Sequence, residues 1–168
     1  DKLGIHASPT CVMSFGENDG ALGWLIGAEN TGMAAMFTMM NNARLNVGIQ
    51  GVGLAEQATQ IAMSYATDRV QGRAPDADRG DNTPVPIATH PDVRNMLMTM
   101  RALTDAARAI CYENGVFHDL AHFGGDEKAK AFNDLLTPIS KAFSTDIANE
   151  VSSLGVQIHG GMGFIEET

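Results

Sequence analysis

Three long stretches of helically spaced apolar residues dominate this sequence and leave little room for any architecture other than a helical one. They cover about residues 32–69, a segment that starts at 89–92, and a segment that follows 124–126. The first would form a helix roughly 55 Å long, at ~1.5 Å per residue. With connections at about 70–89 and 119–126, the three helices are predicted to run antiparallel. We therefore expect a mainly α chain, an up-down bundle of three long helices.

Local signals set the expected limits of these helices. Pro91 marks the first turn of the second helix, which should end near Gly115 or somewhat beyond. Pro138 should bend or break the third helix near its first third. The apolar positions predicted to face the core are Met33, Met36, Phe37, Met40, Val47, Val52, Ala55, Ala58, Ile61, Ala62 and Tyr65, then Val93, Met96, Leu97, Met100, Leu103, Ala107, Ile110 and Cys111, then Phe132, Leu135, Leu136, Ile139, Phe143, Ile147, Val151, Leu154 and Ile158.

Residues 1–28 differ from the helical remainder. Two β-prone runs, 10–15 and 22–26, flank a turn-rich stretch at 16–20, which predicts at most a short N-terminal β remnant. Two strands alone are marginally stable in water, so we expect the edge of a sheet that belongs to a larger protein. A bundle commonly has a fourth helix, which is missing from this sequence. Both observations predict an internal fragment.

Composition and charge exclude several classes of partner. The 168 residues are 44% hydrophobic and 18% charged, which suits one soluble globular domain. A formal net charge of −9 argues against nucleic acid or an anionic membrane as the main partner. No apolar run is long enough to span a membrane, and no signal peptide is recognisable. Cys11 and Cys111 form no metal-binding or CxxC spacing, so we expect buried thiols and a cytoplasmic location.

A polar cluster interrupts the first helical stretch, and three glycines follow it. A solvated helix face would explain the polar residues equally well. Each glycine, however, costs up to ~1 kcal/mol in a helix, and such glycines usually allow close contact with another backbone or a ligand. An arginine there could bind a phosphate or carboxylate bidentately. The residues are Asn41, Asn42, Arg44, Asn46, Gly48, Gly51 and Gly53.

The run from Gln157 to Phe164 carries three glycines in four positions. A helix C-terminal cap is the commoner explanation. The alternative is a turn whose exposed backbone N–H groups hold a phosphate, with His159 as a donor. His118 and His122 could share a helix face as a metal pair, but no third ligand accompanies them, and a polar loop explains them better. No Ser/His/Asp or Cys/His constellation can be assembled by spacing.

Taken together, five motifs resemble the acyl-CoA dehydrogenase family over nearly the whole chain. The insertion after Arg69 and the Met-rich first helix look most similar to the branch that includes the 3-methylmercaptopropionyl-CoA dehydrogenases. The resemblance implies that residues 1–28 end the middle β-domain and that 29–168 form a truncated C-terminal helical bundle domain. The motifs are Gly32-Met33, Asn41-Asn-Ala-Arg44, Gly51-Val-Gly-Leu-Ala55, Tyr65-Ala-Thr-Asp-Arg69 and Gln157-Ile-His-Gly-Gly-Met-Gly-Phe164.

Site residues follow from the resemblance, position by position. Asn41 and Arg44 match the acyl-CoA substrate position, facing the thioester end and the pantetheine portion. Arg69, Val70 and Gln71 match a segment that reaches the FAD of a neighbouring subunit, although the family's aromatic residue is absent because Gly72 follows Gln71 directly. A further set matches the turn that contacts the adenosine and pyrophosphate of FAD, again across a homodimer or homotetramer. This set is Gln157, Ile158, His159, Gly160 and Gly161.

The family's reaction removes the α-proton with a glutamate and the β-hydride with flavin N5, giving a 2-enoyl-CoA in fatty acid metabolism. The resemblance also implies electron-transfer flavoprotein as the acceptor. The glutamate usually follows the glycine motif, which predicts a position beyond Thr168. A minority of members place it where this chain has Ala43, which cannot act as a base. We therefore expect no catalytic residue in this chain, with Glu166 and Glu167 no substitute, and an inactive fragment.

Two other functions stay open from the sequence. The chain could be a non-catalytic helical bundle that self-assembles through its Met-rich faces. It could also belong to a flavin-binding relative with different chemistry, acting on nitroalkanes or damaged DNA.

Overall fold

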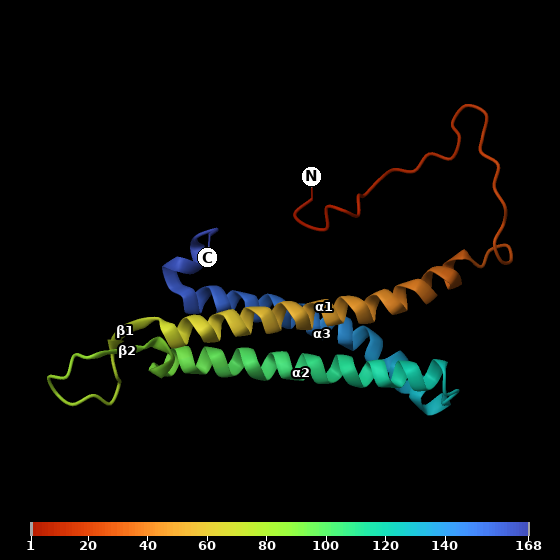
Figure 1. Ribbon diagram of the computed structural model, residues 1–168. Helices are drawn as coiled ribbons and strands as arrows, with labels where there is room; N and C mark the ends of the chain where they lie inside the picture. Colours follow the sequence, from red (N-terminus) through yellow and green to blue (C-terminus); the bar gives the residue numbers. More distant parts are fainter. Residues whose placement is uncertain (1, 168) are drawn as a thin grey trace. The chain divides into compact units, whose positions relative to one another are not determined.

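Three long antiparallel helices make up most of the structure, a computed structural model that describes residues 2–167 (Figure 1). Helix α1 spans Gly32–Asp68, α2 spans Pro91–His122 and α3 spans Glu127–His159. The chain runs along α1, returns along α2 and runs again along α3. The mainly α fold class and the up-down order of three helices are confirmed. Asp1 and Thr168, the outer limits of the two expected domains, lie outside the described residues.

The helix limits follow local chemistry. Asp126 caps α3, its Oδ1 accepting from the backbone N–H groups of Lys128 at 2.8 Å and Ala129 at 3.1 Å. Pro91 occupies the first turn of α2, as predicted. Gly115 does not end this helix, which continues beyond it to His122, as the alternative limit allowed. Pro138 lies inside α3 without breaking it.

The only strands in the described chain lie between α1 and α2, not at the N-terminus. Strand β1, Val70–Arg73, pairs antiparallel with β2, Pro84–Pro86, and the short 3₁₀ helix η1, Ile87–Thr89, leads into α2. A second 3₁₀ helix, η2, Gly160–Phe164, follows α3.

The two β-prone N-terminal runs form no strand, which corrects the expected short N-terminal β remnant. A turn does form at 16–20, where Gly20 N–H donates to the Gly16 carbonyl at 2.9 Å. Strand geometry requires a paired neighbour, and Trp24 is 85% exposed with no ladder beside it in the described chain. By its contacts the chain divides into residues 1–36 and residues 37–168, and the bundle core lies in the second unit.

The buried face of α3 is polar over its first half, contrary to the predicted stripe. Phe132, Leu135 and Ile139 are 40%, 58% and 41% exposed. The side chains that face the core there are instead Asn133, Thr137, Ser140 and Ser144. Hydrogen bonds make their burial possible, because every buried polar side-chain atom of the described residues has a partner. The period of the pattern predicted the helix correctly, but it predicted the wrong face.

Two glycines of α1 let its backbone approach that of α3. A Cβ added at Gly48 would lie 2.9 Å from the Ser140 carbonyl oxygen, and one at Gly51 would lie 2.6 Å from that of Ser144. A Cβ at Gly53 would meet nothing within 4 Å. The close backbone contact expected of these glycines is therefore present at two of the three positions.

These glycines provide a matched test of the α1–α3 contact. Gly51→Ala should lower the free energy of unfolding by about 1–3 kcal/mol, because the new methyl group collides with backbone. Gly53→Ala should raise it by up to about 1 kcal/mol, because alanine is the better helix former. Urea denaturation followed by circular dichroism measures both. A Gly51→Ala chain as stable as Gly53→Ala would contradict the close approach.

An ion-pair network joins α1 to α2 on the side of the bundle. The Arg108 guanidinium bonds to the Glu56 carboxylate of α1 and to Asp105 of its own helix. Hydrogen bonds from Gln60 and Arg108 hold the pKa of Glu56 below its ordinary value. Arg101 and Arg108 likewise lower the pKa of Asp105.

A depressed folded-state pKa makes stability fall in acid. The unfolded carboxylates take up protons first as the pH drops, so the network's contribution is present at neutral pH and is lost below about pH 5. Arg108→Gln should therefore be less stable at neutral pH, and its stability should depend less on pH. Urea midpoints between about pH 6 and pH 3 measure this. Arg94→Gln, at a position without an ion pair among the described residues, is the control, and equal pH slopes for all three chains would refute the assignment.

Candidate functional site

A cleft of about 540 Å³ opens where α1 and α3 end and α2 begins. Five segments line it: the end of α1, strand β1, helix η1, the start of α2, and the turn from α3 into η2. The lining residues are Tyr65, Arg69, Gln71, Ile87, His90, Asp92, Val93, Ile158, His159, Gly160, Gly161 and Met162. Six of the eight residues predicted to bind the cofactor therefore meet in one cleft, although they come from segments about ninety residues apart in the sequence.

His159 is held rigidly in this cleft. Its ring stacks on Tyr65 with centroids 4.3 Å apart and planes 26° from parallel. Its Nδ1 donates to the Gly155 carbonyl oxygen at 2.7 Å. In the neutral ring this bond leaves Nε2 as the acceptor, so the orientation of the imidazole is fixed by α3 and α1 together.

The basic side of the cleft is organised by strand β1. The Arg69 guanidinium donates to Gln71 Oε1 at 3.4 Å, and His90 Nε2 donates to the Gln71 carbonyl oxygen at 2.7 Å. Gly72 has a φ of +72°, and a Cβ there would lie 3.4 Å from the His90 ring. Arg69 thus brings a guanidinium to the cleft of a chain of net charge −9, with Asp92 the acidic residue among the lining groups.

Three glycines lie in the turn after α3, and the structural reason for glycine differs at each position. Gly160 adopts φ 59° and ψ −132°, a backbone conformation that favours glycine, and caps α3. A Cβ at Gly163 would lie 2.6 Å from the Val156 carbonyl oxygen, so packing requires glycine there. A Cβ at Gly161 would meet nothing within 4 Å, so no contact within the chain explains this glycine. Its missing side chain widens the cleft.

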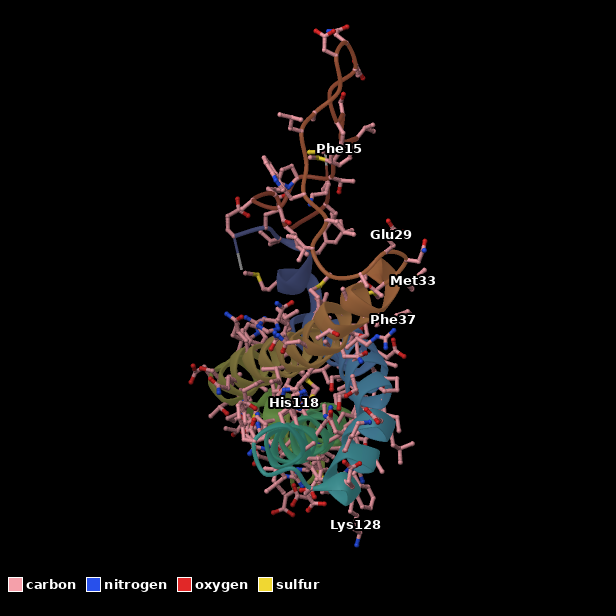
Figure 2. The ribbon with its side chains drawn as sticks, turned by 90° about the vertical axis from the view of Figure 1, so that its right-hand side faces the viewer. Phe15, Glu29, Met33, Phe37, His118 and Lys128 are labelled. Carbon is pink, nitrogen blue, oxygen red and sulfur yellow. The ribbon has the colours of Figure 1, made fainter. Side chains whose placement is uncertain are left out.

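The two residues predicted to bind the substrate, Asn41 and Arg44, lie near the opposite end of the bundle. Arg44 Nη1 donates to Asn41 Oδ1 at 3.1 Å, and both side chains line a hollow of about 310 Å³ between α1 and α3. Phe37 of α1 and Asn133, Asp134, Thr137 and Pro138 of α3 complete this hollow. Figure 2 looks along the bundle from this end and labels Phe37 on α1, His118 on α2 and Lys128 at the start of α3.

Four residues considered as site residues from the sequence line neither the cleft at the end of α3 nor the hollow at Arg44. Val70 and Gln157 are exposed and line neither the cleft nor the hollow. Glu166 and Glu167 are exposed and line neither.

The two histidines considered as a metal pair lie side by side at the end of α2. The rings of His118 and His122 lie 4.2 Å apart, and His122 Nδ1 donates to the His118 carbonyl at 3.1 Å. Among the described residues no group of three or more metal-ligating side chains lies together. In that same part of the chain, no helix is both long and apolar enough to cross a lipid bilayer.

Sequence reasoning missed three polar or aromatic residues of the cleft, namely Tyr65, His90 and Asp92. Tyr65 was counted with the apolar stripe of the first helix, and His90 and Asp92 were considered only as part of a helix start. Their positions could have indicated them. Tyr65 lies one turn before Arg69, and His90 and Asp92 lie at the N-terminus of a helix, where anionic ligands are favoured.

Comparison with known proteins gives a consistent result. The sequence profile described as "Acyl-CoA dehydrogenase, C-terminal domain" matches residues 30–168. A 3-methylmercaptopropionyl-CoA dehydrogenase of Ruegeria pomeroyi is 53% identical over 170 residues, which are 99% of this chain and 28% of that protein. A butyryl-CoA dehydrogenase of Syntrophomonas wolfei is 37% identical over 175 residues, again 99% of this chain and 28% of that protein.

A solved structure agrees with the sequence matches. The butyryl-CoA dehydrogenase from Megasphaera elsdenii superposes with a TM-score of 0.65 at 26% identity, over 84% of this chain and 32% of that one. The chain thus spans about a third or less of the relatives that it matches. The family consists of flavoprotein oxidoreductases that use acyl-CoA substrates and typically form oligomers. Both the predicted family and the predicted branch are confirmed, and the chain belongs to the acyl-CoA dehydrogenase family, whose C-terminal helical domain it contains.

Proposed function

We propose that this chain is the helical, ligand-binding part of an FAD-dependent acyl-CoA dehydrogenase that converts an acyl-CoA thioester to the 2-enoyl-CoA. In this proposal residues 1–28 end the middle β-domain and 29–168 form the C-terminal bundle. The cytoplasm is the proposed compartment and electron-transfer flavoprotein the proposed acceptor. The single observation that carries the proposal is the convergence of Arg69, Gln71 and residues 158–161 in one cleft.

The cleft suits the adenosine diphosphate part of FAD. Its volume of about 540 Å³ lies within the usual range for small-ligand sites. The Arg69 guanidinium can bind a phosphate bidentately, and the stacked pair of Tyr65 and His159 offers a rigid aromatic wall. Gly161 leaves room for a ligand beside the backbone. Val70 and Gln157 would take part only through backbone contacts, since neither side chain lines the cleft.

The hollow at Asn41 and Arg44 suits the substrate. Arg44 brings a positive charge, and Asn41 fixes the guanidinium by accepting one of its N–H groups. The nearby Asp134 is paired with Lys130 at 2.8 Å, so Arg44 keeps N–H groups to donate to the substrate. The thioester and pantetheine carbonyl oxygens of an acyl-CoA are acceptors for these groups.

The distance between the two places supports sharing of active sites between subunits. Arg44 and Arg69 are separated by 25 positions along and just past α1, or about 38 Å at 1.5 Å per residue. Hydride transfer needs reacting atoms about 3–3.5 Å apart. One chain therefore cannot easily hold FAD in its cleft and present substrate at its own Arg44. In a homodimer or homotetramer, FAD bound in the cleft of one chain could reach substrate bound in the hollow of another chain.

In this proposal the residues of this chain bind and orient the FAD and the acyl-CoA, but none of them removes the α-proton. The chemistry that a flavin supplies is acceptance of a hydride from the β-carbon of the acyl group. Three positions come into question for removal of the α-proton, and none suits it. Ala43 carries only a methyl group, Asp134 is paired with Lys130, and Asp92 lines the cofactor cleft at the other end of the bundle from Arg44. We propose that the base lies outside residues 1–168, so the isolated chain should not turn over.

Substitution of Arg69 tests the cleft. Arg69→Ala should weaken binding of FAD or ADP about tenfold to a hundredfold, because a charge-assisted hydrogen bond to phosphate is lost. Fluorescence quenching of FAD or calorimetry with ADP measures the affinity. Arg73→Ala, on the same strand but outside the cleft, is the control. Equal affinities for the Arg69→Ala and parent chains would refute the site.

The glycines of the turn separate ligand binding from packing. Gly161→Ala should leave the unfolding midpoint nearly unchanged but weaken FAD binding, because the methyl group enters the cleft. Gly163→Ala should lower the midpoint, because its methyl group meets the Val156 carbonyl. If Gly161→Ala bound FAD as the parent does, the turn would be a cap and nothing more. Steady flavin bleaching by the isolated chain with butyryl-CoA would contradict the missing base.

A further inference from the structure

Strand β1 can receive few hydrogen bonds from its neighbour β2. Two of the three residues of β2 are prolines, which have no N–H, so Val85 is the only residue of β2 that can donate to β1. The register leaves Gln71 and Gly72 together opposite Val85, as a bulge. A two-stranded sheet is also marginally stable in water by itself. The place of Gln71 in the cleft therefore needs a contact from outside the sheet.

His90 supplies this contact from the start of α2. Its Nε2–H donates to the Gln71 carbonyl oxygen at 2.7 Å, across 19 positions of the sequence. Its ring also lies against Gly72, where an added Cβ would be 3.4 Å from both Cε1 and Nε2 of the imidazole. His90 thus fastens the bulge of β1 to the helical bundle.

The same side chain leaves its usual local role unfilled. His90 occupies the N-cap position of α2, yet its side chain makes no capping hydrogen bond. A preferred N-cap residue would accept from an N–H group of the first turn. Only the backbone of His90 takes part in the helix start, since its N–H donates to the Ile87 carbonyl at 3.0 Å and its carbonyl accepts from Arg94 N–H at 2.9 Å. The imidazole is therefore used for β1 and not for α2.

Gln71 passes this restraint on to Arg69. The backbone of Arg69 is held independently, because its N–H donates to the Tyr65 carbonyl and its carbonyl accepts from Ile87 N–H, each at 2.8 Å. The exposed guanidinium donates to Gln71 Oε1 at 3.4 Å. A hydrogen bond of this length is easily lost when its acceptor moves. The direction of the guanidinium in the cleft thus depends on where Gln71 lies.

We propose that His90 is a positioning residue of the cofactor cleft. By binding the Gln71 carbonyl it keeps Gln71 in place and, through Gln71, directs the Arg69 guanidinium toward the phosphates of FAD. This rests on the proposed function. His90 lines the cleft, but its Nε2–H is already used within the chain, so it acts through Arg69.

Two amide substitutions separate this contact from the start of α2. In His90→Gln the amide nitrogen lies as many bonds from Cβ as Nε2 of histidine does, so it can still donate to Gln71. In His90→Asn the amide is one bond shorter and cannot reach, whereas asparagine is a preferred N-cap residue and supports α2. His90→Asn should weaken ADP binding about threefold to tenfold without lowering the unfolding midpoint. His90→Gln should bind within about twofold of the parent. Calorimetry with ADP and thermal unfolding followed by circular dichroism measure both.

A double-mutant cycle tests the route through Arg69. In a chain that carries Arg69→Ala, His90→Asn should cause no further loss of ADP affinity, because the guanidinium that His90 positions is gone. A ligand-free readout is the chemical shift of the Gln71 carbonyl carbon. It should move in His90→Asn and stay near its parent value in His90→Gln.

Thr89→Val is the matched control. It removes a hydroxyl that donates to the Pro86 carbonyl at 2.5 Å, so it loosens β2 beside His90 without altering a residue that lines the cleft. Its affinity for ADP should equal that of the parent.

The outcomes distinguish this inference from the function on which it rests. Weaker ADP binding in His90→Asn, recovery in His90→Gln and no added loss in the double variant support the inference. Parent-like affinity in His90→Asn, or an unmoved Gln71 carbonyl shift, overturns it, while the Arg69 site stands. Equal losses in both His90 variants, or additive losses in the double variant, also overturn it, because His90 would then act independently of Arg69. If the parent chain did not bind ADP, or if Arg69→Ala bound it equally well, the proposed cofactor cleft would be refuted, and the inference with it.

Discussion

The close backbone contact between α1 and α3 sets the geometry on which both candidate sites depend. Gly48 and Gly51 lie against the Ser140 and Ser144 carbonyls, where a single methyl group would collide. This contact fixes how far α1 can slide along α3. With that register, Asn41 comes beside Asn133 near the start of α3, and Tyr65 stacks on His159 at its end. A slip of one turn would separate both pairs, because neighbouring turns are about 5.4 Å apart.

A rigid helix then keeps the two ligand-binding places apart. Because α1 is one continuous helix from Gly32 to Asp68, with Val52, Ala55 and Ala62 buried in the core between the two places, the chain cannot fold back along it. The cofactor phosphates are therefore proposed to bind at one end of the bundle, and the substrate at the other end. Apolar side chains left exposed on the bundle, such as Phe132 and Leu135, are consistent with contacts to further chains or domains. This family typically forms oligomers.

The sequence predicted the helices and the cofactor residues well because both leave local signals. Helical period, Pro91 and Asp126 are sufficient to place the helices, and the glycine turn at 160–163 is unusual enough to be noticed. Prediction from the sequence failed where the structure of one segment depends on another segment that packs against it. The β-prone runs of residues 1–28 have no strand beside them in the described chain, and β1 forms because Val70–Arg73 happens to meet Pro84–Pro86. The buried polar face of α3 was missed because periodicity cannot tell which face a neighbouring helix will cover. The hydrogen bond from Asn133 of α3 to Asn114 of α2 depends on how the two helices pack, which no spacing in the sequence reveals.

A crystal structure of the chain with bound FAD tests the central claim most directly, because it locates both ends of the cofactor relative to both sites. The account predicts that the diphosphate lies within hydrogen-bonding distance of Arg69 and beside Gly161, with the flavin ring directed away from Arg44 of the same chain. A diphosphate bound elsewhere, or a flavin ring that lies against Asn41 and Arg44 of the chain whose cleft holds its adenosine, would contradict it.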